Sequence, residues 1–265
     1  MSSSPLVTRL TLEYDGSAFA GWARQPGRRT VQQELEQALA VVLRRDVAVT
    51  VAGRTDTGVH ALGQVVSYEG PTAPAHKLNA LLPDDVAVLD ASPAPPGFSA
   101  RHDATSRAYR YRVLARRSRS AHLRGRALHW PHRLDLAALD ACAAALVGEH
   151  DFTAFTPTET HHVRFERDVW TARWERHGEL LEFAIEADAF MRNMNRVLVG
   201  TMLEVAGGRR TVAEFAALLD GAPRSRAGKT APPHGLYLAG VGYDGRPVLP
   251  RRGGHPGEAN TMDRR

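Results

Sequence analysis

The sequence predicts an α+β fold built from two similar halves. Residues 6–14 alternate between apolar and polar side chains, which is typical of a half-buried strand. Thr30 begins a stretch with apolar residues at helical spacing. The order of strands and helices then occurs twice, once on each side of a proline-rich stretch at residues 92–97. Each half therefore has the β-α-β-β-α-β order of ferredoxin-like folds, and we expect the two sheets to pack together and leave a central cleft.

The first half, residues 1–97, opens with the strand at 6–14. Thr30 and Gln33 have the spacing of a capping box, which predicts the start of a helix that runs to about Arg45. Alternating and β-branched runs predict the strands that follow. The remaining elements are a strand at 47–51, a strand at 62–68, a short helix at 76–82 and a strand at 86–90.

The second half, residues 98–249, contains a predicted hairpin, because residues 168–176 and 180–187 both alternate with a period of two. Thr211 and Glu214 form a second capping box, which opens a short helix. The other elements are a strand at 108–115, a helix at 134–147, a helix at 190–206 and a closing strand at 236–243. We expect no regular structure in two segments, a long loop at 116–133 and a disordered tail at 250–265.

Composition excludes several classes of protein. The 265 residues are 43% hydrophobic, which is usual for a folded globular protein and too high for a disordered chain. No apolar run approaches the roughly 20 residues that cross a bilayer, and the N-terminus does not resemble a signal peptide, so we expect a soluble cytoplasmic protein. The single cysteine, Cys142, excludes an intrachain disulfide and a cysteine-rich zinc site.

Basic residues are concentrated in one part of the chain. The formal net charge is +5, yet nine arginines and only one acid, Asp103, occur between Arg101 and Arg126. Arginine pairs with phosphate through a planar fork and stacks on bases. The cluster therefore favours a polyanionic partner such as nucleic acid, although a solvated surface has the same composition.

Residues 52–61, AGRTDTGVHA, are the clearest candidate for a catalytic segment. They follow a predicted strand, and Gly53 and Gly58 flank Arg54 and Asp56. Glycines permit a sharp turn and the close approach of a ligand to the backbone. Composition alone favours an ordinary structural turn, because an aspartate two residues before a glycine is common at strand ends.

The whole ten-residue segment is more specific, and it resembles the catalytic segment of the tRNA pseudouridine synthase A family, in which its aspartate is the nucleophile. The resemblance extends from about Leu6 to Tyr243. It includes, in the same order, Glu13–Gly16, Gly21–Gln25, Phe98–Arg101, Tyr109–Tyr111, Phe190–Gly200 and Gly235–Leu238.

The resemblance implies a pseudouridine synthase fold and an isomerase that acts on uridines 38, 39 and 40 in the anticodon stem-loop of tRNA. It also implies a homodimer with one tRNA spanning both subunits. The uracil is detached through N1, rotated and rejoined through C5. We expect neither cofactor nor metal, because this reaction gains or loses no atoms and involves no redox change.

The resemblance also implies roles for individual residues. Asp56 attacks C1′ or C6, or assists glycal formation, and must be ionised to do so. Arg196 matches the family's active-site arginine and would keep that carboxylate charged in a desolvated cleft. Tyr109 matches the active-site tyrosine, which would stack on the extruded base and is a candidate proton acceptor near C5. Arg54 would brace the space left by the flipped base or hold a phosphate.

One departure from the family pattern lies beside Arg196, where Met194-Asn-Arg-Val197 replaces a Met-Val-Arg-Asn type of sequence. Several further arginines are candidate phosphate contacts, which position RNA without reading its sequence. They are Arg24, Arg101, Arg107, Arg110, Arg112, Arg116 and Arg117.

Two other functions fit parts of the sequence. A non-catalytic RNA-binding module would explain the arginines but not the combination of Asp56, Tyr109 and Arg196. A nucleoside hydrolase or glycosidase would use Asp56 but commonly needs a second carboxylate as general acid. Residues 47–68 contain no other acid, which favours the isomerase.

Overall fold

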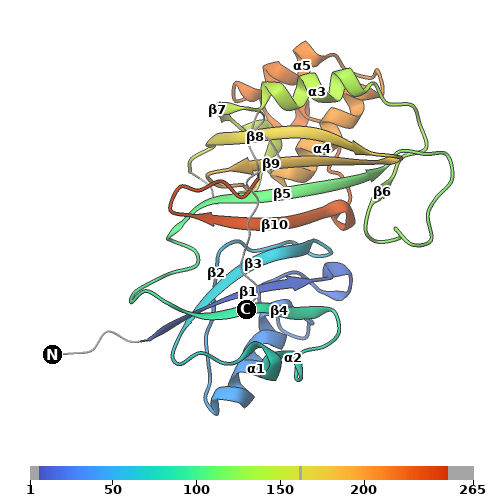
Figure 1. The fold of residues 1–265 in the computed structure, drawn as a ribbon. Helices are drawn as coiled ribbons and strands as arrows, with labels where there is room; N and C mark the ends of the chain where they lie inside the picture. The colour runs from blue at the N-terminus through green and yellow to red at the C-terminus, as the bar shows by residue number, and fades with distance from the viewer. Residues whose placement is uncertain (1–5, 161–162, 250–265) are drawn as a thin grey trace, which may run out of the picture.

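The computed structural model describes residues 6–160 and 163–249, which form a mixed α+β fold around one ten-stranded sheet (Figure 1). The strand order is β4-β1-β3-β10-β5-β9-β8-β7, with β2 paired to β3 and β6 paired to β5. The α+β class is confirmed. The expectation of two sheets packed against each other is wrong, because their edges join into a single sheet. The predicted tail at 250–265 lies outside the described residues.

The N-terminal strands form one half of this sheet, and the two N-terminal helices lie beside them (Figure 1). β1 lies between β3 and β4 and is antiparallel to both. The elements are β1 (Val7–Tyr14), α1 (Val31–Leu43), β2 (Thr50–Val51), β3 (His60–Glu69), α2 (Ala75–Asn79) and β4 (Val86–Ala94), with a short 3-10 helix, η1 (Gly16–Ala18), after β1.

Three expectations for this part are corrected. Thr30 precedes α1, but its buried hydroxyl makes no capping hydrogen bond. The strand predicted at 47–51 is reduced to Thr50–Val51, because the Val49 N–H donates to the Glu36 carboxylate instead of to a neighbouring strand. β4 extends into the proline-rich stretch, where Pro93 is tolerated because β4 is an edge strand.

The C-terminal strands form the other half of the sheet, and α3, α4 and α5 lie beside them (Figure 1). The hairpin of β8 and β9 and the capping box at Thr211 are confirmed. The helix predicted from Phe190 begins only at Met194, and β7 is an additional short strand. The elements are β5 (Ala104–Leu114), β6 (Leu128–His129), α3 (Leu136–Ala145), β7 (Gly148–Asp151), β8 (Glu166–His177), β9 (Leu180–Ala187), α4 (Met194–Ala206), α5 (Val212–Ala216) and β10 (Leu236–Tyr243), with 3-10 helices η2 (Thr153–Phe155), η3 (Ala217–Leu219), η4 (Arg224–Arg226) and η5 (Pro233–Gly235).

The last strand of the chain joins the two parts. β10 lies between β3 and β5, parallel to β3 and antiparallel to β5. The parallel pairing is short, with Tyr237 opposite His60 and Leu238 opposite Ala61. Leu238 is also opposite Tyr109 on β5. The loop that precedes β3 is therefore brought close to the middle of β5.

A cluster of buried apolar side chains extends through both parts, from Leu10 on β1 to Leu198 on α4. The division of the chain into domains at residue 97 stays a prediction. None of the helices among the described residues is both long and apolar enough to span a membrane.

Candidate active site

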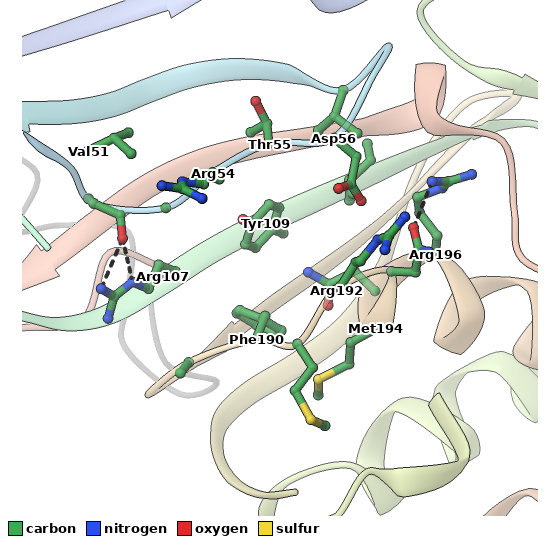
Figure 2. A pocket seen from close by; sticks show the side chains of 18 of the residues that line it. Val51, Arg54, Thr55, Asp56, Arg107, Tyr109, Phe190, Arg192, Met194 and Arg196 are labelled. Atoms are coloured by element: carbon green, nitrogen blue, oxygen red, sulfur yellow. Dashed lines mark hydrogen bonds between the residues drawn. The ribbon is translucent and has the colours of Figure 1, made fainter. Parts of the chain in front are cut away.

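A cleft of about 740 Å³ opens at the junction of the two parts (Figure 2). Two segments and four further residues line most of it. Residues 51–56 form the first, which we call the Asp56 wall, and residues 189–196 form the second, which we call the Arg196 wall. Arg101, His102, Arg107 and Tyr109 lie between them. The structure thus brings Asp56, Tyr109, Arg196 and Arg54 into one cavity, as the sequence predicts.

The Asp56 wall ends in a tight turn. The Val59 N–H donates to the Asp56 carbonyl over 3.1 Å, and Gly58 has a φ of +76°, which a residue with a side chain rarely adopts. The Trp22 N–H donates to the Thr55 carbonyl over 3.0 Å, which attaches the turn to the loop after β1. Asp56 is half-buried, and its carboxylate faces the cleft (Figure 2).

A buried polar network lies beneath this wall. Gln64 Nε2 donates to the Gly53 carbonyl over 2.7 Å and to the Tyr14 hydroxyl over 3.3 Å. The hydroxyls of Tyr14 and Thr55 are 2.8 Å apart. Burial raises the pKa of Tyr14 to about 12, so its hydroxyl stays protonated near neutral pH and the network beneath the wall is uncharged. The network fixes the backbone on both sides of Arg54.

Tyr109 presents its ring to the cleft from β5. Its ring meets Phe190 edge to face, with 5.1 Å between the centroids. Burial raises the pKa of Tyr109 above its ordinary value, and the neighbouring Tyr14 and Asp56 add to the effect. The hydroxyl therefore stays protonated near neutral pH, which favours stacking on a base over accepting a proton.

Arg196 lies in the first turn of α4 and is held at two points. Its Nε donates to the Ala231 carbonyl over 2.7 Å, and its Nη1 donates to Asn193 Oδ1 over 2.9 Å. Burial lowers the pKa of Arg196, and the charge of Asp56 opposes that shift. Among the described residues, no ion pair within 4.0 Å joins Asp56 to a cation. The two charges therefore interact across the cleft and not in direct contact.

Arg107 has a structural arrangement that the sequence did not predict. Its guanidinium makes five hydrogen bonds to backbone carbonyls: two to Ala52 and one each to Arg101, Ala104 and Asp188. Figure 2 shows the two bonds to Ala52. Because an arginine has five N–H groups, none is left for a phosphate. Arg107 braces the Asp56 wall against the neighbouring segments.

The other predicted arginines divide into two groups. Arg54 and Arg101 line the cleft and are exposed, so both are open to a phosphate. The remainder lie outside the residues that line the cleft, and most pair with carboxylates. Arg24 pairs with Glu36, Arg110 and Arg112 both pair with Glu182, Arg116 pairs with Glu179, and Arg117 is exposed.

Sequence reasoning missed three residues of the Arg196 wall: Phe190, Arg192 and Asn193. A helix from residue 190 would have distributed these side chains around its surface. Instead, α4 begins after Asn193, whose φ of +61° turns the chain. A usable signal was Asn193 itself, because asparagine is a preferred residue at helix starts and tolerates a positive φ.

One group of side chains outside the cleft has the composition of a metal site. Donor atoms of Glu175, His177 and Glu182 lie within 4.8 Å of one another on β8 and β9. Both carboxylates already pair with arginines, Glu175 with Arg173 and Glu182 with Arg110 and Arg112. These cations compensate the negative charge that would otherwise attract a metal ion.

Comparisons with known proteins agree with the contents of the cleft. A sequence profile of the tRNA pseudouridine synthase family matches residues 11–103 and 142–244. The tRNA pseudouridine synthase A of Bacillus pumilus is 41% identical over 246 residues, which are 90% of this chain and all of the relative. That of Bacillus subtilis is 40% identical and covers 89% of this chain and 98% of its own length. That of Frankia casuarinae is 43% identical and covers 95% and 94%.

Proposed function

This chain belongs to the tRNA pseudouridine synthase family, an isomerase family that converts uridine to pseudouridine in tRNA, and we propose that it uses Asp56 as its nucleophile. The observation that carries this proposal is the position of the Asp56 carboxylate. It projects from a braced turn into a cleft that also contains an aromatic ring and a guanidinium from the other part of the chain (Figure 2).

The reaction breaks the C1′–N1 bond and forms a C1′–C5 bond, while a proton leaves C5 and another is taken up at N1. Asp56 attacks C1′ or C6 of the target nucleotide, or assists formation of a glycal. Each route requires an ionised carboxylate. The guanidinium of Arg196 favours that ionised form and, after substrate binding, stabilises charge that develops near it.

Tyr109 supports the extruded uracil. Its ring is braced by Phe190, so the two aromatic side chains offer a flat surface of fixed orientation. Stacking of a base on such a ring is worth about 1–3 kcal/mol, which offsets much of the few kcal/mol that base flipping costs. The raised pKa of Tyr109 favours this role over that of a base.

The RNA enters along the exposed cations of the cleft. Within residues 6–160 and 163–249, the side chains of Arg54 and Arg101 make no hydrogen bond or ion pair. Both line the same cavity as Asp56, so they are placed to contact phosphates on either side of the target uridine. The substrate region is the anticodon stem-loop, at positions 38, 39 and 40. The enzyme works in the cytoplasm as a homodimer in which one tRNA spans both subunits, and needs no metal ion or cofactor.

The first experiment replaces Asp56→Asn and measures tritium release from tRNA labelled with 5-³H-uridine. Asparagine preserves the size of the side chain but cannot act as the nucleophile, so turnover is expected to be lost while tRNA affinity stays within roughly tenfold. Asp84→Asn changes an exposed carboxylate outside this cleft and is the matched control. Substantial turnover by Asp56→Asn would remove Asp56 from the nucleophilic role.

A second experiment addresses the product and the site. Mass spectrometry of tRNA treated with the wild-type protein is expected to find pseudouridine at positions 38 to 40. Modification only at other positions would contradict the proposed substrate region. Free uracil in the reaction would instead indicate a hydrolase, and binding without either product would indicate a non-catalytic RNA-binding module.

A further inference from the structure

Asn193 has an unusual conformation for a residue at the start of a helix. Its φ is +61° and its ψ is −3°, which is the left-handed region. Among the described residues, only Arg44 and Asp244 are other non-glycine residues with a positive φ. Asparagine adopts this region more readily than most residues, yet the conformation still needs support from its surroundings.

The side chain of Asn193 does not do what this position usually requires. An asparagine before a helix commonly accepts a hydrogen bond from the first free N–H groups of that helix. Asn193 makes no such bond to α4. Its Oδ1 instead accepts a hydrogen bond from Nη1 of Arg196, over 2.9 Å. The left-handed turn therefore directs the amide toward the arginine one turn ahead.

This bond completes the orientation of the Arg196 guanidinium. Nε is held by the Ala231 carbonyl, and the Ala231 N–H donates back to the Arg196 carbonyl over 3.0 Å. One contact at Nε leaves the planar group free to tilt, whereas a second at Nη1 fixes its plane. Within the described residues, the guanidinium makes no other hydrogen bond, and Arg196 lines the cleft, so its remaining N–H groups are open to a ligand there.

We infer that Asn193 is a positioning residue, which orients Arg196 toward Asp56 and the reacting nucleotide. The inference rests on the proposed role of Arg196 in the reaction. The positive φ of Asn193 places its carboxamide beside Arg196. The carboxamide then orients the guanidinium, which the backbone conformation alone does not do.

Asn193→Gly separates these two contributions, because glycine keeps the left-handed conformation but removes Oδ1. We expect kcat to fall by roughly 10-fold or more, since a hydrogen bond to a charged group is lost from an oriented catalytic group. KM for tRNA and the melting temperature should change little. Asn193→Asp keeps an acceptor at the same atom and should retain more activity than Asn193→Gly.

A double-mutant cycle shows whether the effect acts through Arg196. Arg196→Lys keeps a positive charge but cannot make both bonds of the guanidinium, so Asn193→Gly should cost less than about twofold in that background. An equal loss in both backgrounds, or wild-type kcat in Asn193→Gly alone, would overturn the inference.

The proposed function is tested separately by Arg196→Ala. Wild-type turnover in Arg196→Ala would reject the catalytic role of Arg196, and with it the inference about Asn193. Loss of turnover in Arg196→Ala together with normal turnover in Asn193→Gly would reject only the inference.

Discussion

The two walls of the cleft are held in place by different physical means. The Asp56 wall is held through its backbone: Gln64, Tyr14 and Thr55 are linked by buried hydrogen bonds beneath it, and Arg107 donates to the Ala52 carbonyl. The Arg196 wall relies on a charged group that donates to one backbone carbonyl and one side chain. The carboxylate is thus presented by a rigid backbone turn, whereas the cation is aimed by its own side-chain contacts.

This difference predicts different responses to substitution. A buried network of neutral groups loses stability when one member is removed, because its partners are left without hydrogen bonds. Removal of a contact that orients a cation lowers turnover first, because the chain around the cation remains folded. Removal of a group from the network beneath the Asp56 wall should therefore mainly lower stability. Removal of a contact that orients Arg196 should mainly lower turnover, except where the backbone beside Arg196 is displaced.

The largest stability effect is expected from Gly200→Ala, which displaces that backbone. Gly200 lies one turn after Arg196 on α4, and a Cβ there would overlap the Lys229 carbonyl oxygen. The segment that carries Ala231 must move, so the protein should lose about 1–3 kcal/mol of unfolding free energy, and turnover should fall as well. Urea denaturation and tritium release measure the two effects.

Gly53→Ala is the matched control on the Asp56 wall. A Cβ at Gly53 would meet only the Tyr109 hydroxyl, at 3.9 Å, and the φ of Gly53 is not positive. Its stability should stay within about 0.5 kcal/mol of wild type. Equal unfolding free energies of the two alanine variants would contradict this explanation. They would mean that the position of Ala231 beside Arg196 does not depend on the close contact between Lys229 and α4.

A smaller effect is expected from Tyr14→Phe, which removes one hydroxyl from the network under the Asp56 wall. Gln64 and Thr55 each lose a partner in a buried site, so the unfolding free energy should fall by about 1–2 kcal/mol. Tyr111→Phe removes a single bond to the Pro232 carbonyl and should cost less. A smaller loss in Tyr14→Phe than in Tyr111→Phe, measured by urea denaturation, would contradict the importance of the network.

Local patterns predicted much of the fold. Alternation identified β1 and the hairpin of β8 and β9, and the capping box at Thr211 was visible in the sequence. These features depend on neighbouring residues only. The length of the strand predicted at 47–51 was overestimated, because the Val49 N–H donates to the carboxylate of Glu36 on α1. No local pattern contains that information.

The same distinction applies to the site. The segment around Asp56 was found because its residues are contiguous and resemble a known family. The brace formed by Arg107 was not found, because it depends on which carbonyls the fold brings to one guanidinium. Phe190 was also placed on a helix, because Asn193 was not recognised as the residue at which α4 starts. Charge composition predicted a basic surface but not that Glu182 pairs with two of its arginines.

The smallest effect on the free energy of unfolding is expected from a change in pH. It concerns His60, which lies between the Asp56 wall and the long loop at 116–133. His60 accepts a hydrogen bond from the Gly16 N–H at Nδ1, so Nε2 carries the proton and donates to the Gly125 carbonyl. Burial lowers the pKa of His60, although the facing Asp15 opposes the shift; Arg126 lies on the same side and adds to it.

Because His60 stays neutral in the folded protein while the unfolded chain binds a proton below a pKa of about 6.5, acidification favours unfolding. The stability that His60 contributes is complete above that pH, declines as the pH falls through it, and is fully lost below the folded-state pKa. His234, whose pKa burial also lowers, acts in the same direction. His60→Gln, which retains an Nε2 donor for Gly125, should reduce the loss of unfolding free energy between pH 7 and pH 5. An unchanged pH dependence in this variant, measured by urea denaturation, would mean that other groups carry the effect.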